Sequence, residues 1–125
     1  MLKAYCLDQN VGTMSPIQFT NLSVQKGSTA VLQTPGSIAL NKCGVYMIAV
    51  NASSVAASTI QLMVNGVAQL GAQATGTSPA FVDLVQVDHN NTSCCCSSPT
   101  IIQVINSGTA AADFTNASIA ITKVC

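Results

Sequence analysis

One run of this chain is apolar on both faces of any strand that it could form, and it reads Val45-Tyr46-Met47-Ile48-Ala49-Val50-Asn51. A half-exposed strand alternates apolar and polar residues, whereas a strand covered on both faces is apolar throughout. The run has more hydrophobic positions than one face of a sheet needs. We therefore predict a central strand, with one side in the protein core and the other side available to a neighbouring molecule.

The flanking sequence also has the two-residue period of strands. Residues 37–41 alternate, and a short turn at Lys42-Cys43-Gly44 joins them to the central run. Residues 60–64 alternate up to Asn65-Gly66, which is the strongest short hairpin signal, and residues 67–70 can form the returning strand. Further strands are predicted at 81–87, 100–105 and 117–124, with a turn at 106–108. This spacing, without helical periodicity, predicts an all-β jelly-roll sandwich of about eight to ten strands.

The composition is unusually poor in charge. Only 6% of the residues are charged, and these are lysines and aspartates in equal number, with no arginine or glutamate. A typical soluble domain carries about 25% charged residues, and the centre of a protein interface is depleted in charge. We therefore expect this neutral surface to lie against copies of the chain or a larger assembly.

Two classes of partner are not expected. The lysines are scattered singly along the sequence, whereas nucleic-acid binding needs clustered basic residues. No apolar run approaches the length of a membrane-spanning helix. The first residues also lack the long apolar segment of a secretory signal, so we expect synthesis in the cytoplasm or earlier removal of a signal.

Four segments resemble, in their order, those of one known family. They are Ser15-Pro16-Ile17-Gln18-Phe19, Ile38-Ala39-Leu40 followed by Gly44-Val45-Tyr46-Met47-Ile48, Ile60-Gln61-Leu62-Met63-Val64-Asn65-Gly66, and Ala117-Ser118-Ile119-Ala120-Ile121-Thr122-Lys123-Val124. Together they resemble the C1q and tumour-necrosis-factor-like jelly roll, in the minimal form found in bacterial spore-surface and bacteriophage virion proteins. The chain departs from the family in its cysteines and in an Asn/Cys/Ser insert between residues 87 and 100.

The resemblance implies a homotrimer in which one sheet of each subunit packs around a threefold axis. The candidate interface residues are Tyr46, Ile48 and Val50, all in the central run. Tyr46 suits a buried contact because it is an aromatic residue with a polar tip. The alternative is that Tyr46 fills the core of the sandwich, and both interpretations remain open.

The six cysteines do not form an evident disulfide framework. Cys6 and Cys125 lie near the two ends of the sequence. The resemblance implies that the first and last strands are neighbours, so a disulfide or close approach of these two thiols is one hypothesis. Reduced thiols that serve as small apolar residues are the default for a protein assembled in the cytoplasm.

The loop from Asp88 to Pro99 holds the remaining candidate binding residues, which are His89, Asn90, Asn91, Cys94, Cys95 and Cys96. A thiolate and imidazole set suits zinc, but adjacent cysteines point in different directions and lack the usual Cys-x2-4-Cys spacing, so no cofactor is predicted. A third hypothesis places the cysteine triplet near the oligomer axis, where copies could share a metal or form interchain disulfides.

Catalytic groups are scarce. The aspartates are far apart, His89 is the one histidine, and Gly76-Thr77-Ser78-Pro79-Ala80 lacks the strand and helix that flank a true nucleophile elbow. We therefore predict a non-enzymatic protein.

The leading hypothesis is a trimeric capsid decoration, cement or head-fibre protein of a bacteriophage, located on the virion surface and bound to itself and to a major capsid or other virion protein. Residues 1–10 are predicted to be an attachment arm and residues 11–125 the jelly-roll domain. The alternative is a receptor- or glycan-binding tip or adhesin on a virus or spore, with loops 71–78 and 88–99 as its candidate binding loops. A small hydrolase is the third hypothesis, and it would depend on Ser78 and His89.

Overall fold

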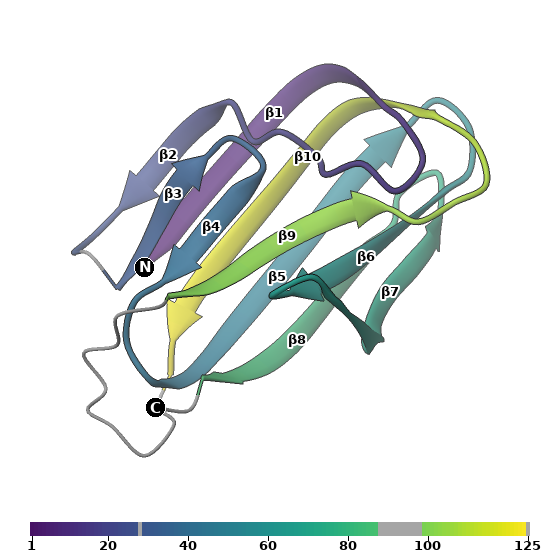
Figure 1. Cartoon of the computed structure of the whole chain (residues 1–125). Helices are drawn as coiled ribbons and strands as arrows, with labels where there is room; N and C mark the ends of the chain where they lie inside the picture. Colours follow the sequence, from purple (N-terminus) through teal and green to yellow (C-terminus); the bar gives the residue numbers. More distant parts are fainter. Residues whose placement is uncertain (28, 88–98, 125) are drawn as a thin grey trace.

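The computed structural model describes residues 1–27, 29–87 and 99–124, and these form ten β-strands without any helix. Two five-stranded antiparallel sheets pack face to face as a sandwich (Figure 1). Sheet A has the order β2-β1-β10-β5-β8 and sheet B the order β3-β4-β9-β6-β7. The predicted all-β jelly-roll sandwich is thereby confirmed. The bounds are β1 Leu2–Val11, β2 Asn21–Gln25, β3 Ala30–Thr34, β4 Ser37–Leu40, β5 Gly44–Ser54, β6 Ser58–Val64, β7 Val67–Gly76, β8 Ala80–Val87, β9 Thr100–Asn106 and β10 Ala112–Lys123.

The central run forms β5, which lies between β10 and β8 in sheet A. Its side chains alternate as a strand requires: Tyr46, Ile48 and Val50 are buried between the sheets, while Met47 is exposed on the opposite side. Strands β4 and β5 flank the predicted turn but belong to different sheets. The turn therefore carries the chain from one layer of the sandwich to the other.

The predicted hairpin at Asn65-Gly66 is confirmed. Both residues have positive φ, at 51° and 79°, and Val64 pairs with Val67 across the turn. Positive φ at both central positions is the type I′ pattern, whose twist matches that of the flanking strands. Strand β7 then continues to Gly76, so most of the predicted 71–78 loop is strand. That part of the loop prediction was wrong, because the small residues of this segment fit an exposed edge strand.

The predicted N-terminal arm is also wrong. Residues 2–11 form β1, which pairs with both β2 and β10. Leu2, Ala4 and Cys6 are fully buried in the core. The segment that was predicted to reach another molecule is an integral part of sheet A, because its alternating apolar residues complete the core of its own chain.

The quoted segment 15–19 lies beside the part of β9, the middle strand of sheet B, that does not pair with β4. The Ile17 amide donates a hydrogen bond to the Val104 carbonyl at 2.7 Å, and Pro16 forms a β-bridge with Ile105. Ile17 and Phe19 are buried in the core. These contacts close the end of the sandwich where β4 is too short to accompany β9.

Candidate functional site

The outer face of sheet A, turned away from the core, is the main candidate for an interaction surface. It is formed by alternate residues of β1, β10, β5 and β8, which are Tyr5, Leu7, Asn116, Ser118, Ala120, Thr122, Val45, Met47, Ala49, Asn51, Val82, Leu84 and Gln86. None of these residues is charged. Two charged residues of those strands lie on this face, and they are at its opposite ends: Lys3 near the start of β1 and Asp113 near the start of β10.

Aliphatic side chains gather on the outer face where β5 meets β8. Met47 lies opposite Leu84, and Ala49 lies opposite Val82. Met47 is 41% exposed, Val82 62% and Leu84 63%. Large apolar side chains that are paired across neighbouring strands form a continuous patch rather than scattered surface residues. This patch is the second apolar side that the central run predicted.

The three predicted interface residues lie on the other side of that strand. Tyr46 and Ile48 are 0% exposed and Val50 is 2% exposed within a single chain. A side chain that is already enclosed by its own chain cannot contact a sister subunit, so the assignment of these residues to an interface is corrected. Because both faces of the run are apolar, the sequence does not reveal which set of alternate residues faces the core.

Tyr46 is held at the end of the core by its hydroxyl. The hydroxyl donates a hydrogen bond to the Lys42 carbonyl at 2.6 Å. Burial raises the pKa of Tyr46, and the hydrogen bond to the Lys42 backbone opposes this shift. The aromatic ring fills the core while its polar tip is satisfied locally, which is the alternative interpretation that the sequence left open.

The cysteine hypotheses have different outcomes. β1 and β10 are neighbours, as expected, but Cys6 lies opposite Ala117 and is a free, buried thiol. The strands are antiparallel, so Lys123, near the end of β10, lies beyond Leu2 at the other end of β1. The Cys6 to Cys125 disulfide is therefore wrong. Cys43 is disulfide-bonded, which corrects the expectation that all thiols are reduced.

The remaining cysteine and loop predictions fall on residues that the structure does not describe. Cys125 and the candidate loop residues His89, Asn90, Asn91, Cys94, Cys95 and Cys96 lie outside the described ranges. Within the ranges that are described, no group of three or more metal-ligating side chains is present. The zinc and shared-metal hypotheses thus stay as they were.

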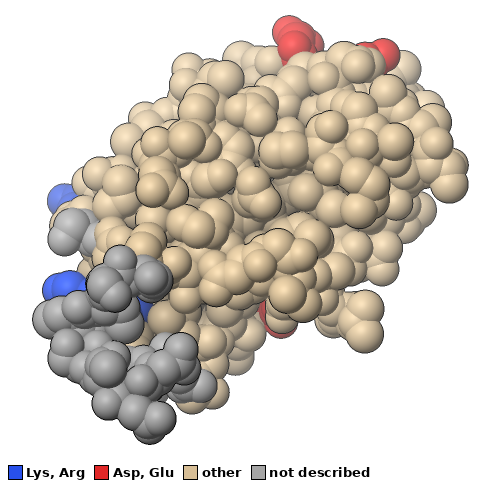
Figure 2. Space-filling view, viewed as in Figure 1, with Lys and Arg blue, Asp and Glu red and all other residues tan. Residues whose placement is uncertain are grey.

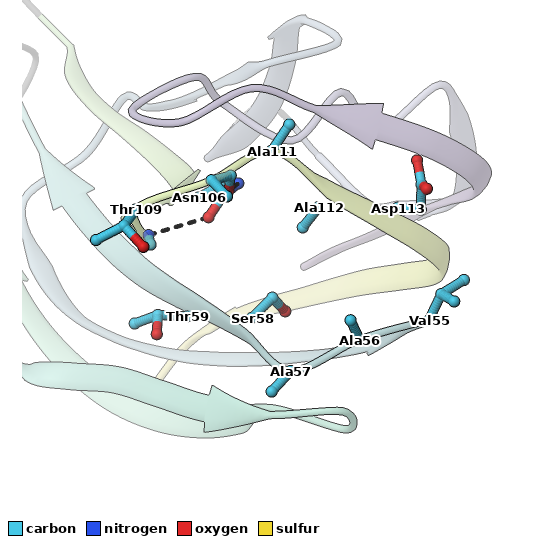
Figure 3. A pocket seen from close by; sticks show the side chains of 12 residues that line it. Val55, Ala56, Ala57, Ser58, Thr59, Asn106, Thr109, Ala111, Ala112 and Asp113 are labelled. Carbon is cyan, nitrogen blue, oxygen red and sulfur yellow. Dashed lines mark hydrogen bonds between the residues drawn. The ribbon is translucent and has the colours of Figure 1, made fainter.

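A pocket of about 320 Å³ lies at the end of the sandwich between the β5–β6 and β9–β10 connections (Figure 3). It is lined by Val55, Ala56, Ala57, Ser58, Thr59, Asn106, Gly108, Thr109, Ala110, Ala111, Ala112 and Asp113. The sequence did not single out this pocket, because its lining is mostly small residues without a motif. Its hydroxyl and carboxylate groups can bind a small polar ligand, but its lining holds no histidine or cysteine to activate a nucleophile.

Asn106 supports this pocket structurally. It is fully buried, and its amide nitrogen donates to the carbonyls of Val11 and Ala110, both at 3.0 Å. Its amide oxygen accepts a 3.0 Å hydrogen bond from the Gly108 backbone (Figure 3). All these bonds hold the β9–β10 connection in place, so the most buried polar group of the pocket is committed to the fold.

Ser78, the serine of the apparent nucleophile elbow, lies in the exposed connection between β7 and β8. A strand follows it and not a helix, as the sequence predicted. Among the described residues, none forms a helix long and apolar enough to cross a membrane.

The comparisons with known proteins agree on the fold. No protein-family model matches the sequence, and no curated protein is similar to it. Three solved structures superpose on 99% of the chain. They are the globular domain of the zebrafish complement 1qA protein (TM-score 0.76, 10% identity, 96% of that chain), the Eiger TNF of S. frugiperda (0.72, 12%, 92%) and the PRD1 vertex protein P5 (0.60, 11%, 96%).

At such identities the similarity concerns the fold, and it extends over nearly the whole of each chain. In its fold, the chain is a C1q/TNF-like jelly-roll domain.

Proposed function

We propose that this protein is a non-enzymatic structural protein that forms a homotrimer through the outer face of sheet A. The observation that carries the proposal is the exposed aliphatic patch of Met47, Val82 and Leu84, on a face whose charged residues Lys3 and Asp113 lie at its two ends. Full burial of one such side chain contributes about 1.5–3 kcal/mol, so covering several half-exposed ones on each subunit is strongly favourable. Water-exposed carboxylates or ammonium groups would have to be desolvated at such a contact, and this patch has none to desolvate.

The proposed location is the surface of a bacteriophage particle, where the trimer decorates or cements the shell or forms a head fibre. Three features support it: the jelly-roll fold, the neutral composition and the similarity in fold to a protein named as the PRD1 vertex protein. Several weak contacts of one trimer with a shell add up, because each contact after the first is made at high effective concentration. The function requires no cofactor, since attachment depends on surface contacts.

Solution mass is the direct test of the trimer. Analytical ultracentrifugation of the purified full chain should give three times the chain mass at micromolar concentration. A stable monomer at high protein concentration would contradict the assembly proposal. The particle proposal is tested separately by mass spectrometry of purified particles from producing cells, where the chain should co-purify with the shell protein at a fixed ratio.

A second candidate is a receptor- or glycan-binding module. The observation that favours it is the pocket between the β5–β6 and β9–β10 connections, whose hydroxyls and Asp113 carboxylate can form hydrogen bonds with a sugar. A glycan array distinguishes this candidate from the first. Binding that is lost in Asp113→Ala but kept in Asp83→Ala, a change outside the pocket, would favour the second candidate.

A further inference from the structure

The four lysines are far apart in the sequence but gather at one end of the sandwich. Figure 2 shows lysine side chains at the end where both termini lie, and acidic side chains at the opposite end and on the lower side of the molecule. Lys3, Lys26, Lys42 and Lys123 are all exposed. We call these four residues the basic end. They are all the basic residues of the chain except His89.

Two of these lysines are brought together by the pairing of β1 with β2. Leu2 pairs with Gln25, and the Lys26 amide donates a hydrogen bond to the Met1 carbonyl at 2.9 Å. Lys26 therefore leaves β2 beside the start of β1, close to Lys3. The antiparallel pairing of β1 with β2 thus brings together Lys3 and Lys26, which are 23 positions apart in the sequence.

The other two are brought together at the start of β5 and the end of β10. Lys123 pairs with Tyr46, and the Tyr46 hydroxyl is bonded to the Lys42 carbonyl at 2.6 Å. The Val124 amide also donates to the Val45 carbonyl at 2.8 Å. Because β10 lies between β1 and β5, both lysine pairs are at the same end of sheet A.

The basic end is a surface of limited width. Neighbouring strands are about 4.8 Å apart, so the four strands β2, β1, β10 and β5 span about 15 Å. The Debye length at physiological ionic strength is about 8 Å, so the potentials of lysines on adjacent strands overlap, while the outermost lysines each act on the part of a partner that lies against them. Among the described residues, no ion pair neutralises any of the four.

The acidic side chains that the structure describes lie elsewhere. Asp8 and Asp113 are exposed at the far ends of β1 and β10, and Asp83 lies within the edge strand β8. The fourth aspartate, Asp88, is outside the described residues. A chain with zero formal net charge thus separates its described charges into a basic end and a weakly acidic end.

We propose that the basic end is a docking surface for a carboxylate-rich surface of another protein. Lysine is a flexible point charge suited to carboxylates on an irregular protein surface, and the exposed Val124 beside it offers apolar contact as well. Nucleic acid is disfavoured because the chain has no arginine, whose planar fork makes bidentate contacts with phosphates and guanines, and because a net charge of zero gives little long-range attraction to a polyanion. A second copy of this chain is disfavoured because its acidic end offers two carboxylates to four ammonium groups.

This inference goes beyond the proposed function, because the basic end is complete on a single chain and needs neither trimer nor particle. Docking through the basic end would fix the orientation of the bound molecule. The end with Lys42 and Lys123 would face the partner, and the end with the pocket and Asp113 would face away from it. In a trimer the same surface would be present three times and would bind with added avidity.

The test measures binding of the full chain to a fluorescently labelled oligo-glutamate peptide by anisotropy at low and at physiological salt. We expect binding that weakens as salt rises. The double variant Lys42→Gln/Lys123→Gln should bind about tenfold more weakly, which is about 1.4 kcal/mol. Lys3→Gln/Lys26→Gln should weaken binding similarly, and it serves as a second variant if the first does not fold.

The matched control is Leu70→Glu/Gln73→Glu on the exposed strand β7, which lowers the net charge by the same amount away from the basic end. It should retain affinity close to that of the parent chain. Equal loss in the control and in the lysine variants would overturn the proposal, because net charge alone would then explain binding. Tighter binding to an oligonucleotide or to vesicles of anionic lipid, or no peptide binding at low salt, would overturn it too. The result does not depend on the oligomeric state, which is measured on the same samples by ultracentrifugation.

Discussion

The outer faces of the two sheets differ in the uncharged side chains that they carry. On sheet B, Thr59 lies opposite Thr75 and Gln61 opposite Gln73, and the two threonine hydroxyls are 2.9 Å apart. On sheet A, the equivalent cross-strand positions hold Met47 with Leu84 and Ala49 with Val82. Amides and hydroxyls are satisfied by one another and by water, whereas aliphatic side chains gain free energy when another surface covers them. A neutral composition therefore does not by itself predict an interface, and the distribution over the faces does.

The largest expected effect separates the two sides of β5 within sheet A. Tyr46→Ala should lower the free energy of unfolding by about 3–5 kcal/mol, because it leaves a cavity between the sheets. Met47→Ala, one residue further on and 41% exposed, should cost less than about 2 kcal/mol. Urea unfolding at matched protein concentration measures both. Equal losses would mean that the core and outer positions of β5 are assigned wrongly.

The next effect compares the two outer faces directly. Met47→Asp places a carboxylate in the aliphatic patch of sheet A, and we expect the trimer to dissociate about 100-fold more readily, since about 3 kcal/mol is needed to bury an unpaired charge there. The matched change Gln73→Asp adds the same charge to the exposed face of sheet B. Sedimentation over a range of concentrations should show dissociation in the first variant alone. If Gln73→Asp dissociates the trimer and Met47→Asp does not, the interface lies on sheet B.

A smaller effect concerns Cys6, a buried residue of β1. Burial raises the pKa of the Cys6 thiol above its ordinary value of 9.0, and a backbone hydrogen bond at Ala117 opposes the shift. The folded state thus holds this proton more tightly than the unfolded state. The stabilisation is fully present below pH 9 and is lost as the pH rises through the folded-state pKa. The stability of the parent chain should fall more steeply above pH 9 than that of Cys6→Ala. Parallel slopes in alkaline urea titrations would show that the thiol titrates alike in both states.

The smallest effect tests the hydroxyl pair on sheet B. Thr59→Val removes one partner of the 2.9 Å contact with Thr75 but keeps the shape of the side chain. We expect the free energy of unfolding to fall by less than about 1 kcal/mol, because a cross-strand pair contributes roughly 0.2–1 kcal/mol. Thermal unfolding measures it, with Thr75→Val as the reciprocal control. A loss as large as that of Tyr46→Ala would remove the contrast between an outer polar face and a buried core.

The sequence predicted those parts of the fold that are encoded locally. The Asn65-Gly66 turn needs two adjacent residues that tolerate positive φ, and this signal requires no knowledge of the tertiary structure. The strands at 81–87, 100–105 and 117–124 are also visible as apolar runs, although β10 begins earlier, at Ala112. Short edge strands such as β2 were missed, because most of its residues are exposed and polar.

The parts of the candidate site that could not be predicted depend on the arrangement of strands. Ile48 and Met47 are both apolar, so only the packing of sheet A on sheet B decides which one is buried. Lys3 and Lys123 are far apart in the sequence, and they come to the same end of sheet A because β1 and β10 pair in antiparallel register. The pocket has no motif, because its lining residues are small and come from two separate connections.

The pairing of β1 with β10 also sets the order of events during synthesis. Strand β1 is synthesised well before its partner β10, which comprises residues 112–123. Sheet A contains both strands, so a nascent chain cannot present the complete outer face. Contacts between such distant segments also slow folding. If subunits associate through this face as proposed, the association must wait until β10 has paired with β1 and β5.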